Sequence, residues 1–243
     1  MNATAHPSAS LLQNHLLAAL PNADWARWQP YLQPVELNAG QVLCEPGWPL
    51  VRAYFPTTAV VSLLCMTRDG ESAEIAVVGN DGVVGLSLFL GGTATPGRAV
   101  VQSAGHAYRL DAQAIGPEVS HGGPVFNLMQ RYSQAMMAQM AQTAVCNRHH
   151  SVDQQLCRRL LLSLDRSPSD EVDMTHELAA NLLGVRRESV TSAARKLQLA
   201  GLIRYGRGHI AVCDREQLEQ RTCECYAVLR KEYDRLRPLP HAA

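Results

Sequence analysis

The spacing of hydrophobic residues changes twice along the chain, near residue 33 and near residue 123. Residues 11–20 and 24–31 carry apolar side chains at helical spacing, whereas residues 33–110 form short period-two stretches between glycine turns. From Val125 to about Arg148, apolar positions recur in steps of three and four. These patterns predict an α+β chain in which an all-β barrel or roll precedes one long helix.

The last third of the chain has the pattern of two short helices, a tight turn and a β-hairpin. Thr175 is a good N-cap because its hydroxyl can accept a hydrogen bond from a free backbone N–H, and Gly184 stands where a helix ends with positive φ. A second helix is expected from near Arg186 to Ala200. Two apolar strands flank residues 205–208. The pattern therefore predicts a winged helix-turn-helix.

The second of these helices leaves a polar face that suits DNA. Arginine can donate two hydrogen bonds to guanine, and glutamate can accept one from the cytosine amino group. The first turn of such a helix meets base edges in the major groove, so Arg187 and Glu188 are the predicted base contacts. The further candidates for base or phosphate contacts are Arg186, Ser189, Thr191, Ser192 and Arg195.

The predicted phosphate contacts lie on either side of that helix. Thr175 and His176 stand at the N-terminus of the first helix, where backbone N–H groups can hold a phosphate. Arg204 and Arg207 belong to the predicted wing and would hold the flanking DNA backbone. Between residues 186 and 207 there are six basic residues and one acidic residue. Double-stranded DNA is therefore the predicted partner.

The run LAANLLGVRRESVTSAARKLQLAGLIRYGRGHI resembles the winged helix-turn-helix of the Crp/Fnr family of bacterial transcription regulators, in the branch with an Arg-Arg-Glu-Ser-Val recognition helix. The resemblance extends over nearly the whole chain. It implies a cyclic-nucleotide-binding-like β-roll, a dimerisation helix and a homodimer on a palindromic DNA site, with RNA polymerase as a candidate further partner. The family often places another arginine where this chain has Ser192, so its usual half-site is not transferred.

These observations divide the chain into four expected parts. Residues 1–32 form an N-terminal tail and short helices, 33–122 the effector-type β-roll, 123–149 the long dimerisation helix, and 150–237 the DNA-binding domain. The expected contacts of the dimerisation helix are Phe126, Met129, Met136 and Met140.

The effector of the roll is a separate question. Cyclic-nucleotide binders of the resembling family have a Gly-Glu pair that holds the ribose and an Arg-Ser pair that holds the phosphate. The matching positions here are Gly85-Leu86 and Arg98-Ala99. Because leucine cannot accept a hydrogen bond, burying the ribose hydroxyl beside it would cost about 1–3 kcal/mol. We therefore predict that the roll does not bind cAMP, and keep a cAMP-responsive regulator with an atypical pocket as an alternative.

Cysteine and histidine positions bear on other cofactors. An iron–sulfur cluster needs about four thiolates, and no cysteine precedes Cys44, so none is predicted. Cys223 and Cys225 have no second pair nearby and would point to different faces of one helix, so we interpret them as core and surface residues and predict no metal site. Haem stays open. Its candidate ligands are His106, His121, His149 and His150.

Charge and composition limit the remaining functional classes of protein to which this chain could belong. The net formal charge is zero, but from Arg148 onward 16 basic residues face 13 acidic ones. A cupin-like metal-dependent β-roll enzyme is the alternative from another class. It needs clustered ligands, and His106 is the one histidine between residues 33 and 110, so we predict no enzyme. No apolar run approaches the ~20 residues that span a bilayer, so a cytoplasmic protein is expected.

Overall fold

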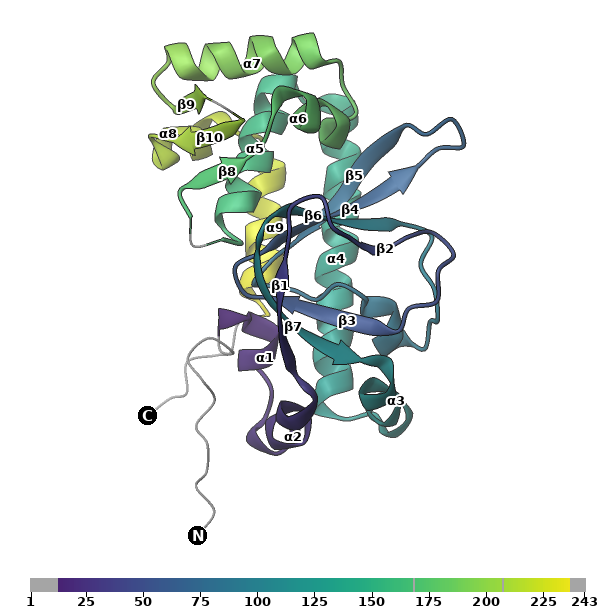
Figure 1. The fold of residues 1–243 in the computed structure, drawn as a ribbon. Coiled ribbons are helices and arrows are strands. Elements are labelled where there is room, and N and C mark those ends of the chain that lie inside the picture. The colour runs from purple at the N-terminus through teal and green to yellow at the C-terminus, as the bar shows by residue number, and fades with distance from the viewer. Residues whose placement is uncertain (1–12, 168, 207, 237–243) are drawn as a thin grey trace, which may run out of the picture.

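The computed structural model describes residues 13–167, 169–206 and 208–236, apart from the side chains of residues 118–121 (Figure 1). Two short helices come first, α1 (His15–Ala18) and α2 (Asn22–Trp28), followed by the 3-10 turn η2 (Gln29–Tyr31). Asn14 caps α1, since its Oδ1 accepts from the backbone N–H groups of Leu16 and Leu17 at 3.1 and 3.2 Å. Its amide also donates to the carbonyls of Pro56 and Gly82, which ties the N-terminal helices to the roll.

The β-roll is built from two antiparallel sheets with strand orders β1-β7-β3 and β2-β6-β4-β5. Their aromatic centre is formed by Trp28, Phe55 and Phe89, whose ring centroids lie 5.8–6.2 Å apart. The period-two prediction is confirmed. The strands are β1 (Gln33–Leu37), β2 (Val42–Cys44), β3 (Arg52–Pro56), β4 (Val60–Met66), β5 (Ser72–Val78), β6 (Arg98–Ser103) and β7 (Gly105–Asp111).

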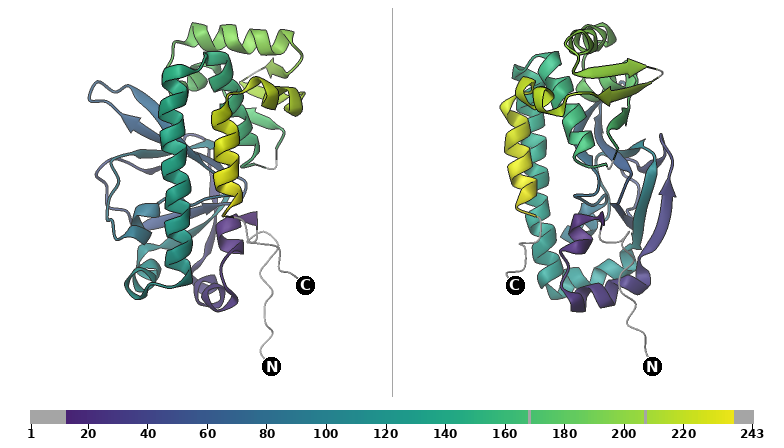
Figure 2. Two further views of the ribbon diagram at one scale, coloured as in Figure 1. Left: turned by 180° about the vertical axis from the view of Figure 1, so that it is seen from behind. Right: turned by 90° about the vertical axis from the view of Figure 1, so that its left-hand side faces the viewer.

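Helices follow and interrupt the roll. The 3-10 segment η3 (Leu86–Leu90) lies between β5 and β6, and α3 (Ala112–His121) follows β7. α3 continues through Pro117, and Gly122 and Gly123 separate it from the next helix. The long helix α4 (Pro124–His149) then runs along the roll (Figure 2).

The C-terminal part has the predicted winged helix-turn-helix order. Ser151 and Gln154 form a reciprocal capping box at the start of the first helix, α5, with hydrogen bonds of 3.1 and 3.3 Å. The strands form one sheet in the order β8-β10-β9. The elements are α5 (Val152–Leu164), β8 (Glu171–Asp173), α6 (His176–Leu183), α7 (Arg187–Leu199), β9 (Ile203–Gly206), β10 (His209–Val212), α8 (Arg215–Arg221) and α9 (Glu224–Asp234).

The roll and the helix-turn-helix share buried surface. Val60 of β4 and Val77 of β5 belong to the same apolar cluster as the inner faces of α5, α6 and α7. The turn at Gly184 also approaches the Ala73 side chain of β5. The position of the helix-turn-helix is therefore set partly by the roll.

Gln139 of α4 is a buried polar residue that donates to the Val77 carbonyl at 3.0 Å and accepts from Arg166 at 3.1 Å. The interpretation of Cys223 and Cys225 as a core and a surface residue of one helix is wrong, because the helix is interrupted at Thr222, between α8 and α9. Both cysteines are buried.

Candidate nucleic-acid interface

Helix α7 is held by its apolar side and presents the opposite side to solvent. Its buried residues recur at helical spacing and pack on α5 and α6, so the exposed side chains have a fixed direction (Figure 1). These buried residues are Val190, Ala193, Ala194 and Leu197. Thr175 caps α6 as predicted, accepting from the Leu178 N–H at 3.0 Å, and Gly184 ends that helix at φ 65°.

The exposed side of α7 forms a shallow hollow lined by charged and hydroxyl side chains. Its residues are Arg187, Glu188, Thr191, Ser192 and Arg195. These are five of the predicted DNA contacts, and the structure brings them onto one surface. Guanidinium donors, a carboxylate acceptor and two hydroxyls together can hydrogen-bond to base edges and to phosphates. The hollow therefore has the chemistry of a base-reading surface.

Arg187 has two contacts within the helix-turn-helix, one through its side chain and one through its backbone carbonyl. Its Nη1 lies 3.7 Å from Oε2 of Glu177 on α6, and its carbonyl accepts from the Thr191 hydroxyl at 3.0 Å. Both side chains of the ion pair are largely exposed, so water and salt screen their attraction. The guanidinium is thus free to exchange Glu177 for an acceptor on DNA.

His176 joins α6, α7 and the wing. Its Nδ1 lies 3.1 Å from Oγ1 of Thr191, and its ring stacks on Tyr205 with centroids 4.0 Å apart. Since the Thr191 hydroxyl donates to Arg187, His176 Nδ1–H must be the donor of this bond. Burial, and then the charge of Arg187, lower the pKa of His176. Both effects favour the neutral ring, which contacts Thr191, while any phosphate at this end of α6 would meet backbone N–H groups.

Three of the remaining predicted contacts lie in the described part of the chain near α7. Arg186 precedes α7 in extended conformation and is exposed, while Ser189 is half-buried at the side of the helix. Arg204 is exposed on β9. Arg207 lies outside the described residues. Lys196 turns back to Asp153 of α5, with Nζ 3.2 Å from Oδ2.

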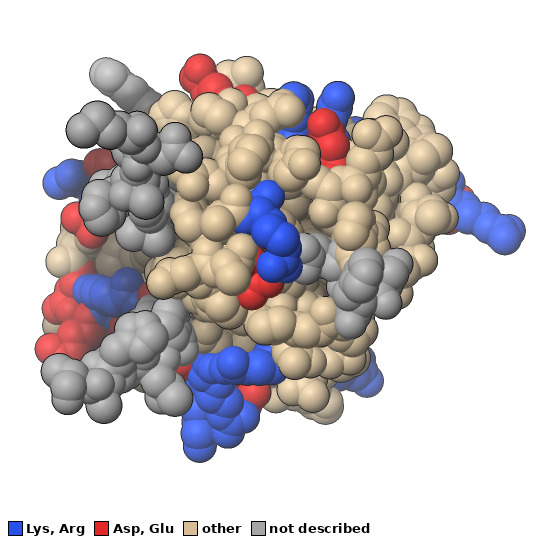
Figure 3. All heavy atoms as spheres, turned by 90° about the horizontal axis from the view of Figure 1, so that it is seen from below, with Lys and Arg blue, Asp and Glu red and all other residues tan. Residues whose placement is uncertain are grey.

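The end of the molecule opposite to α7 carries no comparable surface where it can be seen. In Figure 3, Lys and Arg lie scattered among Asp and Glu on a face that is mostly uncharged, apart from the parts covered in grey. The coloured part of this face therefore offers a polyanion no concentrated positive charge.

The positions that correspond to a cyclic-nucleotide cassette are used within the roll. Gly85 has φ 93° and lies against Arg52 and Ala53, while Leu86 packs against the main apolar cluster. The Arg98 Nε lies 2.9 Å from Oε1 of Glu45, and neither side chain is more than 33% exposed. In this arrangement Leu86 offers no acceptor for a ribose hydroxyl, and the Arg98 charge is already paired. The residues present do not fit cAMP in the family manner.

The predicted contacts of the dimerisation helix divide between two faces. Met129 and Met136 are buried within the chain against the roll, and Met140 is half-buried there, so Met129 and Met136 are not available to a partner and that expectation needs correction. Phe126 is half-buried. The exposed side of α4 instead carries a seam with steps of four and three. Its members are Gln130, Gln134, Met137, Ala141, Ala144 and Arg148.

Two of the haem candidates, His149 and His150, are consecutive residues at the end of α4. His106 and His149 are exposed, and the side chain of His121 lies outside the described part of the chain. His150 is half-buried and lies with its Nδ1 3.6 Å from the sulfur of Cys225. None of the helices in the described part of the chain is long and apolar enough to cross a membrane.

The sequence did not identify three residues that shape this interface. Glu177 faces Arg187, Tyr205 stacks on His176, and Asp153 holds Lys196. Of these three residues, Glu177 was the one that the sequence could have indicated. It is the acidic residue in the first turn of α6, and that turn lies beside the second helix of a helix-turn-helix. The other two contacts join distant segments and depend on the tertiary fold.

Two family models match the chain. The model described as a cyclic nucleotide-binding domain matches residues 34–117, and the model described as a Crp-like helix-turn-helix domain matches residues 154–221. The first model covers the β-roll, and the second covers the helix-turn-helix. A comparison with curated protein sequences finds no match.

Solved structures share the fold over most of this chain. A protein of Eubacterium rectale assigned to the Crp/Fnr family of transcriptional regulators has a TM-score of 0.66 and 18% identity, over 86% of this chain and 98% of that one. FixK2 from Bradyrhizobium japonicum has a TM-score of 0.66 and 15% identity, over 79% and 98%. A c-di-GMP responsive global regulator, CLP, from Xanthomonas campestris has a TM-score of 0.60 and 15% identity, over 80% and 100%.

Proposed function

Because the chain belongs to the Crp/Fnr family of DNA-binding transcription regulators, we propose that it reads a palindromic DNA site as a homodimer through α7. The observation that carries this proposal is the hollow on α7, whose side chains point outward from a buried opposite face. Arg187 and Glu188 are the proposed base contacts. Arg186, Thr191, Ser192 and Arg195 would add base or phosphate contacts around them.

The homodimer is supported by the exposed seam on α4. Met137 is 60% exposed and Val145 is 47% exposed, and both lie in or beside the seam that also carries Ala141 and Ala144. Steps of four and three are what helix pairing requires, and small residues let two helices approach closely. Two recognition helices related by a two-fold axis would then read two half-sites one helical turn apart.

The proposal includes a roll that does not use cAMP. Support comes from Leu86, which replaces the ribose acceptor, and from Arg98, which is paired with Glu45. The matching family model describes the domain type and leaves the ligand open. RNA polymerase would be the partner through which the DNA-bound dimer acts.

The alternative of a cupin-like enzyme has no support in these observations. Its roll would need a set of metal ligands on neighbouring strands. Within the described strands of the roll His106 is exposed, and the two family models are those of a regulator's domains.

Selection from a random DNA pool tests the proposal. The purified full chain is incubated with the pool with and without cAMP at one stated salt concentration, because DNA affinity depends steeply on salt. We expect a palindrome to be enriched equally in both arms. Enrichment only with cAMP would overturn the interpretation of Leu86, and enrichment of single, unpaired half-sites would overturn the homodimer. A pool left unenriched in both arms would contradict DNA reading by the free protein.

A further inference from the structure

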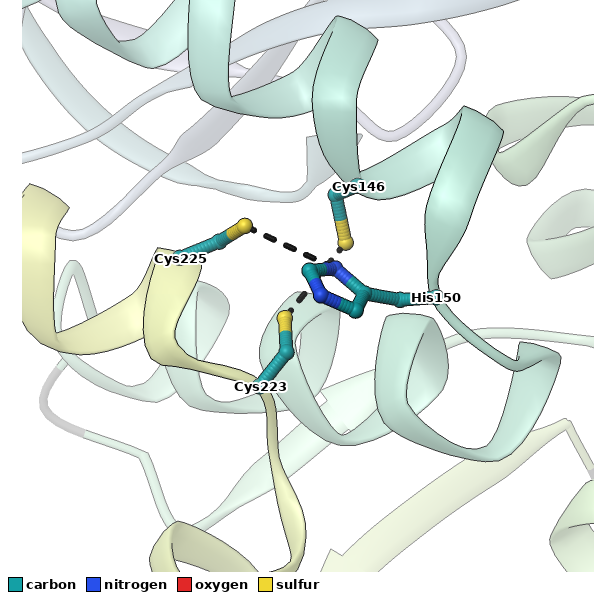
Figure 4. A group of neighbouring side chains, drawn as sticks. All are labelled: Cys146, His150, Cys223 and Cys225. Atoms are coloured by element: carbon teal, nitrogen blue, oxygen red, sulfur yellow. Dashed lines mark hydrogen bonds between the residues drawn. The ribbon is translucent and has the colours of Figure 1, made fainter.

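Four potential metal ligands from two distant segments meet beside the end of α4. Cys146 and His150 come from the last turn of α4 and its C-cap, whereas Cys223 and Cys225 come from the break before α9 and its first turn (Figure 4). One ligand atom from each residue lies within 4.8 Å of every other. Figure 4 shows the four side chains converging on one point.

The spacing of these atoms matches that of a tetrahedral zinc site. With Zn–S bonds of about 2.3 Å and Zn–N bonds of about 2.0–2.1 Å, a tetrahedron places two sulfurs about 3.8 Å apart and a sulfur and a nitrogen about 3.6 Å apart. The sulfurs of Cys146 and Cys223 lie 3.6 Å apart, and the sulfur of Cys225 lies 3.6 Å from Nδ1 of His150. Three thiolates and one imidazole are a common donor set for structural zinc.

The surroundings are those of a ligand set. The Nε2 of His150 lies 3.3 Å from a carboxylate oxygen of Glu224, so that carboxylate can accept the second ring N–H and leave Nδ1 free to bind metal. The three cysteines are at most 4% exposed and form their own small cluster. Cys223 stands at the N-cap of α9, where helix N–H groups favour a thiolate.

Charge is balanced as well. Three thiolates and a neutral imidazole around Zn²⁺ carry a net charge of −1. The buried guanidinium of Arg158 is a neighbouring positive charge. Among the described residues, the Arg158 Nε has no hydrogen-bond partner. Arg158 can thus offset the charge of a loaded site.

We propose that Cys146, His150, Cys223 and Cys225 bind one Zn²⁺ per chain and thereby fasten α9 to the junction between α4 and α5. Only His150 and Ser151 connect these two helices. α4 carries the proposed dimer seam and α5 begins the DNA-binding part, so the metal would fix the hinge between pairing and reading. A cluster of several irons would need its ligands further apart than 4.8 Å. This site goes beyond DNA reading and does not depend on it.

Metal content of the full chain is the first test. The protein is produced without a histidine tag, dialysed, and analysed for zinc, iron and acid-labile sulfide. We expect about one zinc per chain, and after replacement by Co²⁺ the intense visible bands of tetrahedral cobalt with sulfur-to-cobalt charge transfer. Three results would each overturn the proposal: protein that stays metal-free after incubation with Zn²⁺, iron with sulfide, or a Cys146–Cys223 disulfide in protein isolated under reducing conditions.

Variants locate the metal. Cys225→Ala and His150→Gln should each lose most of the bound zinc, whereas Cys65→Ser and Cys213→Ser, which change exposed cysteines, should keep it. Unchanged zinc in Cys225→Ala would place the metal elsewhere and overturn the assignment.

Glu224→Gln provides a test that does not disturb the core, because the Glu224 side chain is 75% exposed. Loss of the carboxylate behind His150 should weaken zinc affinity by about 10- to 100-fold in a competition with a chelating dye. The matched control is Glu216→Gln, an exposed acid on α8, which should leave the affinity unchanged. Equal affinities for Glu224→Gln and the parent protein would contradict the proposed role of His150.

Discussion

Arg159 of α5 and Glu74 of β5 form a buried ion pair, with Nε 2.5 Å from Oε1. The guanidinium also donates to Gln102 and to Ser62 of the roll, and to Ser163 of its own helix. Burial lowers the pKa of Arg159 and the charge of Glu74 opposes that shift. A charge from the DNA-binding part is therefore satisfied by the roll, and the two parts are linked by more than apolar contact.

Removing one member of this pair should lower the free energy of unfolding of the protein. Glu74→Ala leaves the Arg159 charge buried without its carboxylate, and breaking such a pair costs about 3–5 kcal/mol. Urea unfolding at one fixed protein concentration measures the change in the free energy of unfolding. The double variant Glu74→Leu with Arg159→Met should recover most of the loss. A single variant as stable as the parent would show that Arg159 finds enough other acceptors.

The recognition helix should separate base contacts from phosphate contacts. Arg187→Ala removes the first-turn guanidinium from the hollow and should cost about 1–3 kcal/mol on the selected site while affecting random DNA less. Arg204→Ala, on β9, should weaken both DNAs about equally and reduce the salt slope by about 1. Binding titrations at several salt concentrations measure both effects. Identical losses from the two substitutions would contradict this assignment.

Met137 should be important for pairing of two chains. It is the most exposed large apolar residue of α4, and Met137→Glu would place two like charges near the proposed two-fold axis. We expect the dimer to dissociate at protein concentrations at least about 10-fold higher than for the parent, as measured by sedimentation velocity. Met66→Glu is the matched control, because Met66 is 41% exposed on the β4–β5 hairpin. Equal dissociation constants for both variants would place the interface elsewhere.

Local signals in the sequence were sufficient for the elements, and long-range contacts were not available from it. Thr175 and Gly184 mark the ends of α6 through bonds and backbone angles set within a few residues. The stripe of α4 was seen, but its period cannot tell whether the roll or a second chain covers Met129. Cys146 and Cys223 are 77 residues apart in the sequence, and their proximity depends on the interruption between α8 and α9 at Thr222. Local sequence patterns therefore predict the DNA-reading surface on α7, but they do not predict the cysteine cluster, which depends on contacts between distant segments.

Cyclic AMP should leave the stability of the protein unchanged. A ligand present at 100 times its dissociation constant stabilises the folded state by about 2.7 kcal/mol, which gives a clear shift in Tm. Since Leu86 packs against the core and Arg98 pairs with Glu45, we expect no shift with millimolar cAMP. Differential scanning calorimetry measures it, with AMP as the control nucleotide. A shift with cAMP alone would show that the roll binds the cyclic phosphate in another way.

His176 should titrate below its ordinary pKa of about 6.5. Burial and the charge of Arg187 both disfavour its protonated form in the folded protein. Because the folded-state pKa is lower than the unfolded-state value, His176 contributes full stability above about pH 6.5, and this contribution is lost as the pH falls toward the folded-state pKa. Titration of carbon-13-labelled histidine by NMR measures the pKa directly.

Substitution of its neighbour tests the cause of that shift. Arg187→Ala removes one of the two effects and should raise the pKa of His176 partway toward 6.5, while Arg204→Ala should leave it in place. A His176 that titrates at its ordinary value in the parent protein would mean that the stack on Tyr205 and the bond to Thr191 are open in solution. In that case His176 would become protonated as the pH falls through about 6.5 and could then meet a DNA phosphate itself, which the closed arrangement of α6, α7 and β9 does not allow.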